Sequence, residues 1–455
     1  MIAAAAQAPL TTAGPAQLVT AALIGIAAII VLIVWARLHP FLSLMVGSAV
    51  LALAAGIAPV DAFTAFTAGL GDTVGGVGVL IALGAIIGTL LVKSGGADAI
   101  VDAFLARTGE RALPWAMAGL AFVIGIPLFF EVGVVLLIPV VMLVAARVGK
   151  PVVLLGIPAL AGLSALHGLV PPHPGPLIAI DALGADLGLT LGLGLLVSVP
   201  VVVIAGPLSA KVMARWVPIG APATFTAGEP IPAERRPGVG VALSVVLLPV
   251  ALMLARTIAE TTGAGGPVGA ALDILGSPLV ALLITTFVAM AALGLRDGRD
   301  LAAVSDLVGS SFAPVAGILL IVGAGGGFKQ TLVDSGVAEV VASWIEGAPL
   351  SPLVAGWLVA VAIRLATGSA TVATITAAGI MAPIAPGLDP AQQALLVLAI
   401  GCGSVFLSHV NDAGFWLVKE YFGMTVPQTF KTWSLMETIL SVTGLVVVLA
   451  VGLVV

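Results

Sequence analysis

Apolar runs long enough to cross a membrane recur along the whole chain, and short segments between them hold most of the charged residues. A helix of about 20 apolar residues spans a bilayer. The pattern predicts full spans near 18–36, 40–58, 74–92, 187–210, 239–256, 273–295, 301–325 and 433–455. Segment 59–73 is expected to lie outside the membrane, between the second and third of these spans. Arg37 and Lys93 lie at the ends of the first and third spans, and basic residues favour the cytoplasmic side. The N-terminus is therefore expected on the outer side of the membrane.

Two segments combine apolar residues at helical spacing with charged residues. In 97–111 the apolar residues Ile100, Val101, Phe104 and Leu105 share one face, and charges occupy the other. Segment 328–347 has a similar pattern. Both are predicted to be amphipathic helices that lie in the membrane interface.

Four further apolar stretches are interrupted by polar or proline-rich motifs. Stretch 112–146 contains GIPLFFEVG and has basic residues at both ends, which favours a re-entrant hairpin over two full spans. Stretch 350–384 contains RLATGSATVATITAAG and predicts a second hairpin. Stretches 151–185 and 390–418 contain HGLVPPHPGP and SVFLSHVNDAGFW, and each predicts a broken helix, because proline and Asn-Asp do not continue a helix easily.

These elements follow the same order in two halves, 1–211 and 239–455, and corresponding motifs lie about 240 residues apart. The polar, proline-rich segment 212–238 predicts a cytoplasmic linker between them. Counting the crossings turns the second half upside down relative to the first. Inverted repeats with paired broken helices are typical of secondary transporters. The predicted fold is an all-α integral membrane protein with about 10 full spans and two re-entrant hairpins.

Composition supports this class and excludes others. Of 455 residues, 60% are hydrophobic and 9% are charged, with mean hydropathy +1.24, whereas soluble domains carry roughly 25% charged residues. The net charge of −5 is scattered, so no nucleic-acid partner is expected. The single cysteine, Cys402, excludes an intrachain disulfide, and four histidines without cysteine support predict no metal site. The first span lacks a preceding positive charge, so we expect it to be retained and not cleaved as a signal peptide.

Two glycine runs, GDTVGGVG (71–78) and GAGGG (323–327), do not resemble nucleotide loops. No Walker lysine follows either run, so neither ATP nor another cofactor is expected. The first run is interpreted as a flexible joint or, equally, as a surface for close helix packing.

The first broken motif and the first hairpin supply three candidate residues. Glu131 lies among Pro, Phe and Val, where a carboxylate is a candidate proton carrier; the alternative is a structural role at a half-helix N-terminus. His167 and His173 are candidates for substrate binding, with an interhelical hydrogen bond as the alternative. For His173, which lies between two prolines, the functional interpretation is favoured.

The second half supplies the others. Asn411 offers donors and acceptors for hydroxyl groups, and Asp412 is a candidate for substrate binding and for proton coupling; helix capping is the alternative for both. Ser369 and Thr371 lie at the predicted hairpin tip, where half-helix N–H groups suit a carboxylate, unless these residues serve only helix packing. Arg364 requires an anion, either the substrate or a carboxylate such as Glu131 or Asp412.

The motifs HGLVPPHPGP (167–176), HVNDAGFW (409–416) and GIPLFFEVG (125–133) resemble those of the gluconate permease family in the ion transporter superfamily. The resemblance extends over nearly the whole chain. It implies a proton-coupled importer of gluconate or a related small acid in the bacterial inner membrane. The wider superfamily implies a scaffold domain and a transport domain that moves as an elevator, and such scaffolds commonly form homodimers.

The sequence therefore predicts a secondary active transporter, not an enzyme, that imports a sugar acid with protons. A carrier of D-serine or another small hydroxy or amino acid is the alternative on the same scaffold. A passive organic-anion channel and a membrane-embedded enzyme using His and Asp are the alternatives from other classes. The acid carried, and coupling to protons or to sodium, stay open at this stage.

Overall fold

The computed structural model describes residues 9–126, 130–171, 173–222, 231–262, 265–296, 299–337, 340 and 350–454. All regular elements in these ranges are helical. Nine of the helices are long and apolar enough to cross a membrane, and a strongly bent pair raises the number to ten. The all-helical, multi-span prediction is therefore confirmed for the described part of the chain.

The chain divides into two compact units. The first unit comprises residues 1–76, 168–201 and 318–455, and the second comprises 77–167 and 202–317. Each unit therefore combines segments from both halves of the sequence. The boundaries fall inside the elements η1, α8, α10 and α17.

The first unit contains most of the helices that carry the polar motifs. Its elements, including those that begin or end across a boundary, are α1 (Pro15–Val34), α2 (Pro40–Ala54), α3 (Pro59–Thr73), η1 (Val74–Gly78), α9 (Pro174–Leu183), α10 (Leu187–Val203), α17 (Phe312–Asp334), α19 (Pro352–Thr367), α20 (Ala370–Met381), η5 (Ala382–Gly387), α21 (Pro390–Ser404), α22 (Ala413–Phe422), α23 (Val426–Thr429), η6 (Phe430–Ser434) and α24 (Leu435–Val451).

The second unit contains the first predicted hairpin and the segment after the linker. Its elements are α4 (Val79–Lys93), α5 (Gly96–Leu105), α6 (Leu113–Gly125), α7 (Phe130–Val148), α8 (Val152–Leu169), η2 (Ile204–Leu208), α11 (Ser209–Trp216), η3 (Ala233–Arg235), α13 (Val239–Thr262), α14 (Gly266–Leu275), α15 (Pro278–Ala289), η4 (Met290–Gly294) and α16 (Leu301–Ser310).

Proline and glycine set many of the helix ends. Proline occupies the first turn of α9, α19 and α21, where its missing N–H has no helical partner to lose. Gly184, Gly368 and Gly423 follow α9, α19 and α22 with positive φ, the left-handed conformation that glycine adopts without steric cost. These residues end the helices where the chain must turn.

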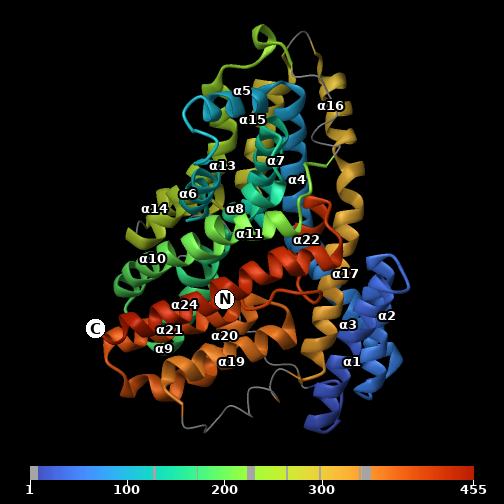
Figure 1. Cartoon of the computed structure of the whole chain (residues 1–455), viewed down its shortest axis with the longest axis vertical. Coiled ribbons are helices and arrows are strands. Elements are labelled where there is room, and N and C mark those ends of the chain that lie inside the picture. Colours follow the sequence, from blue (N-terminus) through green and yellow to red (C-terminus); the bar gives the residue numbers. More distant parts are fainter. Residues whose placement is uncertain are drawn as a thin grey trace. The chain divides into compact units, whose positions relative to one another are not determined.

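The core of the first unit lies among α9, α19, α20 and α21. Figure 1 shows α19, α20, α21 and α24 lying side by side, in agreement with their contacts. Small residues such as Ala360, Ala373 and Ala377 are fully buried in this core. Small side chains let helix backbones approach closely, which is the usual basis of helix packing in membranes.

The glycine run 323–327 of α17 is a packing surface. A Cβ atom at Gly323 would lie 2.7 Å from Val74 Cγ2, and one at Gly327 would lie 2.7 Å from the carbonyl oxygen of Phe66 in α3. A Cβ at Gly325 would lie 3.0 Å from Cδ1 of Trp416 in α22. A Cβ at Gly326 would overlap Oγ1 of Thr73 in α3, so all four glycines of the run are needed for α17 to fit against α3 and α22.

The other glycine run behaves differently. GDTVGGVG continues α3 through the π-helical turn η1, and a Cβ at Gly75 or Gly76 would meet no atom within 4 Å. Close packing therefore does not explain these two glycines. The unit boundary after Gly76 falls in this run, and the interpretation as a flexible joint stays a prediction.

Each interrupted stretch contains a pair of helices. The first hairpin corresponds to α6 and α7, whose connecting residues 127–129 lie outside the described part; the second corresponds to α19 and α20. The two broken stretches correspond to α8 with α9 and to α21 with α22. Corresponding helices begin at 113 and 352, 130 and 370, 152 and 390, and 174 and 413, an offset of about 240 throughout. The inverted relation of the halves and the re-entrant course of the hairpins stay predictions.

Several predicted boundaries are corrected by the structure. Stretch 273–295 is not one helix: α14 and the segment Pro278–Gly294 meet at a 71° bend, where Gly276 ends one helix and Pro278 begins the next. Stretch 301–325 is divided at Ser311, and α17 continues to Asp334. The beginning of the predicted amphipathic segment 328–347 therefore belongs to α17, and most of its remainder lies outside the described residues.

Two further boundaries also differ from the prediction. Segment 59–73, expected to lie outside the membrane, is the helix α3, which runs through η1 into α4. The linker predicted at 212–238 begins later, because α11 continues to Trp216. Residues 223–230 of the linker lie outside the described part.

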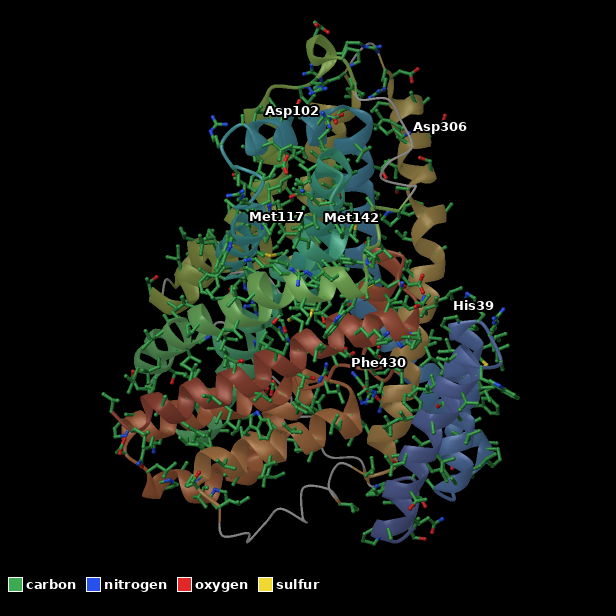
Figure 2. The ribbon with its side chains drawn as sticks, in the orientation of Figure 1. His39, Asp102, Met117, Met142, Asp306 and Phe430 are labelled. Atoms are coloured by element: carbon green, nitrogen blue, oxygen red, sulfur yellow. The ribbon has the colours of Figure 1, made fainter. Side chains whose placement is uncertain are left out.

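Ion pairs fasten the amphipathic helix α5 within the second unit. Ile100 and Val101 are buried, as the pattern predicts. On the opposite face, Asp98 and Asp102 both pair with Arg147 of α7, and Asp102 also pairs with Arg236 after η3 (Figure 2 labels Asp102). A single short helix thus ties the end of α7 to the end of the linker.

Candidate functional site

The break between α21 and α22 meets the tip between α19 and α20. Gly368, at this tip, has φ 69°, and a Cβ atom placed on it would overlap the backbone carbonyl of Asn411. Leu407, in the break, is one of two non-glycine residues with positive φ among the described residues. The chain in this region is therefore held in a conformation that most sequences would avoid.

Asp412 is the centre of a hydrogen-bond network at this junction. Its Oδ2 accepts hydrogen bonds from Nη2 of Arg364 and from the hydroxyl of Ser408. Its Oδ1 accepts a bond of 2.9 Å from the N–H of Gly414, so Asp412 also caps α22. The Ser408 hydroxyl accepts a bond of 2.7 Å from Nε1 of Trp433. Trp433, Ser408, Asp412 and Arg364 thus form a continuous chain from η6 to α19.

The ion pair is withdrawn from solvent. The side chains of Arg364 and Asp412 are 5% and 15% exposed. Removing either partner of such a pair is unfavourable, because the remaining charge has no compensation. Arg364 was predicted to need either the substrate or a carboxylate, and Asp412 provides the carboxylate.

Among the residues that the structure describes, two buried polar atoms at this junction have no hydrogen-bond partner. Asn411 donates from Nδ2 to the carbonyl of Leu365 at 2.9 Å, but its Oδ1 accepts no bond. Nε of Arg364 likewise donates to no acceptor. An acceptor and a charged donor are therefore both available at the junction, the combination that a hydroxylated carboxylate would use.

Helix N-termini also meet in this region. Ser369 caps α20 by accepting a bond of 3.3 Å from Val372 N–H, and Thr371 lies half-buried in the first turn. His173, 2% exposed, precedes α9. A Cβ at Gly175, two residues further on, would lie 3.4 Å from Oγ1 of Thr374 in α20. The starts of α9 and α20 therefore lie together, and the positive ends of their dipoles favour an anion.

The remaining candidates lie in the second unit. Glu131 is half-buried in the first turn of α7. His167, in the last turn of α8, packs against Phe130 with ring centroids 6.3 Å apart. His167 therefore lies beside the start of α7, whose first turn contains Glu131.

Sequence reasoning missed three contributors to the site. Ser408 lies directly before the HVND motif and Trp433 begins the last predicted span, but neither position signals that they contact each other. Gly368 is visible in the sequence as a tip residue, yet its contact with Asn411 joins positions 43 apart in the chain. A polar residue beside a recognised break is the one signal that would have pointed to Ser408.

The apolar helices define a polytopic membrane protein that contains a buried polar junction. The sequence model of the GntP family permeases matches residues 17–454. The chain belongs to this family and is a multi-pass membrane protein of the permease class.

Its relatives are similar over nearly their whole lengths. A gluconate permease of Pseudomonas aeruginosa is 48% identical, with 96% of this chain and 98% of the relative covered. A gluconate permease of Bacillus subtilis is 40% identical over 95% and 98%. An L-idonate transporter of Escherichia coli is 38% identical over 94% and 97%.

Among solved structures, the YdaH transporter of Alcanivorax borkumensis is 17% identical, with a TM-score of 0.41, over 91% of this chain and 99% of that one. This likeness is too low to place any element of the chain.

Proposed function

We propose that the protein imports gluconate or a closely similar sugar acid together with protons, by alternating access. The observation that carries the proposal is the buried Arg364–Asp412 pair beside two unpartnered polar atoms, Oδ1 of Asn411 and Nε of Arg364. The names of the relatives, gluconate permeases and an L-idonate transporter, support a sugar acid as the substrate.

Each part of a sugar acid has a matching group in this proposal. The carboxylate binds at the start of α20, near Ser369 and Thr371, and receives a charge-assisted bond from Arg364. The hydroxyl groups donate to Oδ1 of Asn411 and bond with His173. A substrate without hydroxyl groups would leave the Asn411 oxygen unsatisfied, which disfavours simple carboxylates.

The Arg364–Asp412 pair suggests how a proton is coupled to an anion. While Asp412 is ionised, it neutralises Arg364. When Asp412 accepts a proton, Arg364 keeps its charge and becomes available to the substrate carboxylate. Proton and substrate then enter the site together with no net change in its charge, which reduces the cost of moving them through the membrane. Glu131 in the second unit is the second proposed proton carrier.

Alternating access is supported by the two helix pairs and two broken helices that recur at an offset of about 240 residues. Within this proposal the protein works as an elevator-type homodimer in the bacterial inner membrane. The proposal distinguishes it from an anion channel, which would conduct the acid without accumulating it.

Transport by purified protein in liposomes tests the proposal. We expect labelled gluconate to exchange with internal gluconate, and to accumulate when the outside is made acidic. Accumulation should stop when a protonophore is added, and a sodium gradient alone should not replace the proton gradient. Glu131→Gln should keep exchange but lose accumulation if Glu131 carries a proton. Flux without accumulation in the wild type would indicate a channel, and chemically altered gluconate inside would indicate an enzyme.

A further inference from the structure

Besides Asp412, the first unit has an acidic residue inside its last membrane span, Glu437. Glu437 belongs to the segment Val426–Val451, whose most apolar 18 residues have a mean hydropathy of 2.1. Its side chain is 1% exposed. Lys431 and Glu437 are the only charged residues of this span in the sequence. Carboxylates at such positions are rare, because the ionised form is unfavourable away from water, and they commonly serve proton or ion pathways.

Glu437 lies on the face of α24 that is attached to the candidate site. One turn before it, Nε1 of Trp433 donates to Ser408, and the Ser434 hydroxyl donates to the carbonyl of Ser408. One turn after it, Oγ of Ser441 accepts a bond of 3.0 Å from Nε1 of Trp357 in α19. Residues about four apart share a helix face. Glu437 is therefore enclosed between two anchors, one to the break that holds Asp412 and one to the helix that holds Arg364.

Several ionisable groups lie around this part of α24. Among the described residues of the elements packed most closely against it, they are Arg364 of α19, Cys402 of α21 and Lys431 of η6. The break that Trp433 and Ser434 contact adds His409 and Asp412. The buried residues beside Glu437 on its own helix are Met436, Leu440, Ser441 and Gly444. A proton bound to Glu437 would therefore change the charge on α24, which is attached to the helix that holds Arg364 and to the break that holds Asp412.

We propose that Glu437 is a proton-binding site of the transport cycle, distinct from Asp412. Its carboxylate takes a proton from water on the outer side and releases it on the inner side in the cycle that moves the acid. The protonation state of Glu437 acts on the substrate site through Trp433 and Ser408, which hold Asp412. This inference rests on the proton coupling in the proposed function.

The test compares Glu437→Gln with the wild type in liposomes containing a pH-sensitive dye. Gln keeps the shape of the side chain and cannot release a proton. We expect exchange of labelled gluconate to stay within about twofold of the wild type, while accumulation driven by a gradient of about one pH unit falls about tenfold, because one proton fewer moves with each gluconate. Proton entry per gluconate should fall as well.

Glu420→Gln is the matched control. Glu420 lies in α22 of the same unit and pairs with Lys419 at 2.6 Å, and its side chain is 24% exposed. We expect this variant to exchange and accumulate gluconate like the wild type.

Glu437→Asp keeps the carboxyl group and allows the test even if the Gln variant does not fold. We expect it to remain coupled, with the pH profile of uptake displaced from that of the wild type. The inference is overturned if Glu437→Gln accumulates gluconate with an unchanged proton ratio, if the folded Gln variant also loses exchange, or if the Asp variant has the wild-type pH profile. A wild type that exchanges gluconate without proton entry would instead contradict the proton coupling itself.

Discussion

The two units contain ion pairs of the same chemistry in different surroundings. In the first unit, Arg364 and Asp412 are 5% and 15% exposed, and a single pair carries the interaction. In the second unit, Asp102 is 47% exposed and Arg147 30%, and each of these residues has two partners. Their other partners, Asp98 and Arg236, are 18% and 13% exposed. The first arrangement is one buried pair, whereas the second is a shared network whose central residues are partly hydrated.

This difference distinguishes an ion pair suited to a functional site from ion pairs that only hold helices together. A hydrated pair contributes little to stability, because water and salt compete with it. A buried pair contributes little compared with apolar packing, but losing one partner is costly. A buried pair is therefore a poor choice for stability alone and a good choice where one partner must change its charge.

The largest effect is expected from Asp412→Asn. The substitution leaves the Arg364 guanidinium buried without a counter-charge, which should lower the free energy of unfolding by about 3–5 kcal/mol. Thermal unfolding in detergent measures the change. The double variant Arg364→Met/Asp412→Asn should regain part of the stability, because no buried charge remains. A single variant as stable as the wild type would show that the pair is not effectively buried.

Gly368→Ala should have the next largest effect. A Cβ at Gly368 would overlap the Asn411 carbonyl, and the positive φ of 69° is unfavourable for alanine. We expect a destabilisation of about 1–3 kcal/mol and strongly reduced gluconate uptake. Gly379→Ala in α20 is the control, because a Cβ there meets no atom within 4 Å; it should be neutral or slightly stabilising. Equal effects of the two substitutions would contradict the close contact.

Asn411→Ala and His173→Ala should weaken gluconate binding more moderately. Losing one hydrogen bond to a neutral partner corresponds to about 0.5–1.5 kcal/mol, roughly 2- to 13-fold in affinity. Titration calorimetry of the purified variants measures it. A deoxy analogue that lacks the contacted hydroxyl should lose less affinity than gluconate. Unchanged gluconate binding by both folded variants would reduce these residues to helix breaking and capping.

The smallest effect is expected from Asp102→Asn in the second unit. Its pairs with Arg147 and Arg236 are partly hydrated, so the loss should be about 0.2–1 kcal/mol and should decrease at high salt. Thermal unfolding at two salt concentrations checks both statements. A loss as large as that of Asp412→Asn would remove the contrast between the two units.

The sequence predicts those parts of the fold that depend on local signals. The breaks at 170–173 and 405–412 and the helix pairs in stretches 112–146 and 350–384 follow from proline, glycine and polar motifs in apolar runs. The bend between α14 and α15 escaped because hydropathy continues through Gly276 and Pro278. The division at Ser311 escaped for the same reason. Hydropathy measures the free energy of transfer from water, and it contains no information on the direction in which a helix runs.

The candidate site also has contacts that the sequence allows one to predict and contacts that it does not. Arg364 in an apolar run demands an anion, so its pairing with Asp412 was among the alternatives that the sequence allowed. The hydrogen bond between Trp433 and Ser408 was not, because it joins positions 25 apart whose residue types do not require each other. Long-range partners of neutral polar groups depend on the packing of the helices, and one sequence does not reveal that packing.

The glycine run of α17 has a consequence for the engineering of this protein. Alanine substitutions at 323, 325 and 327 would leave the hydropathy of the span almost unchanged, and alanine is the better helix former. Each added methyl group would nevertheless meet a side chain or a backbone oxygen of α3 or α22. Stabilisation by routine glycine-to-alanine exchange should therefore succeed at open positions such as Gly379 and fail in this run. The space for one methyl group, which a hydropathy plot does not measure, therefore decides which substitutions α17 tolerates.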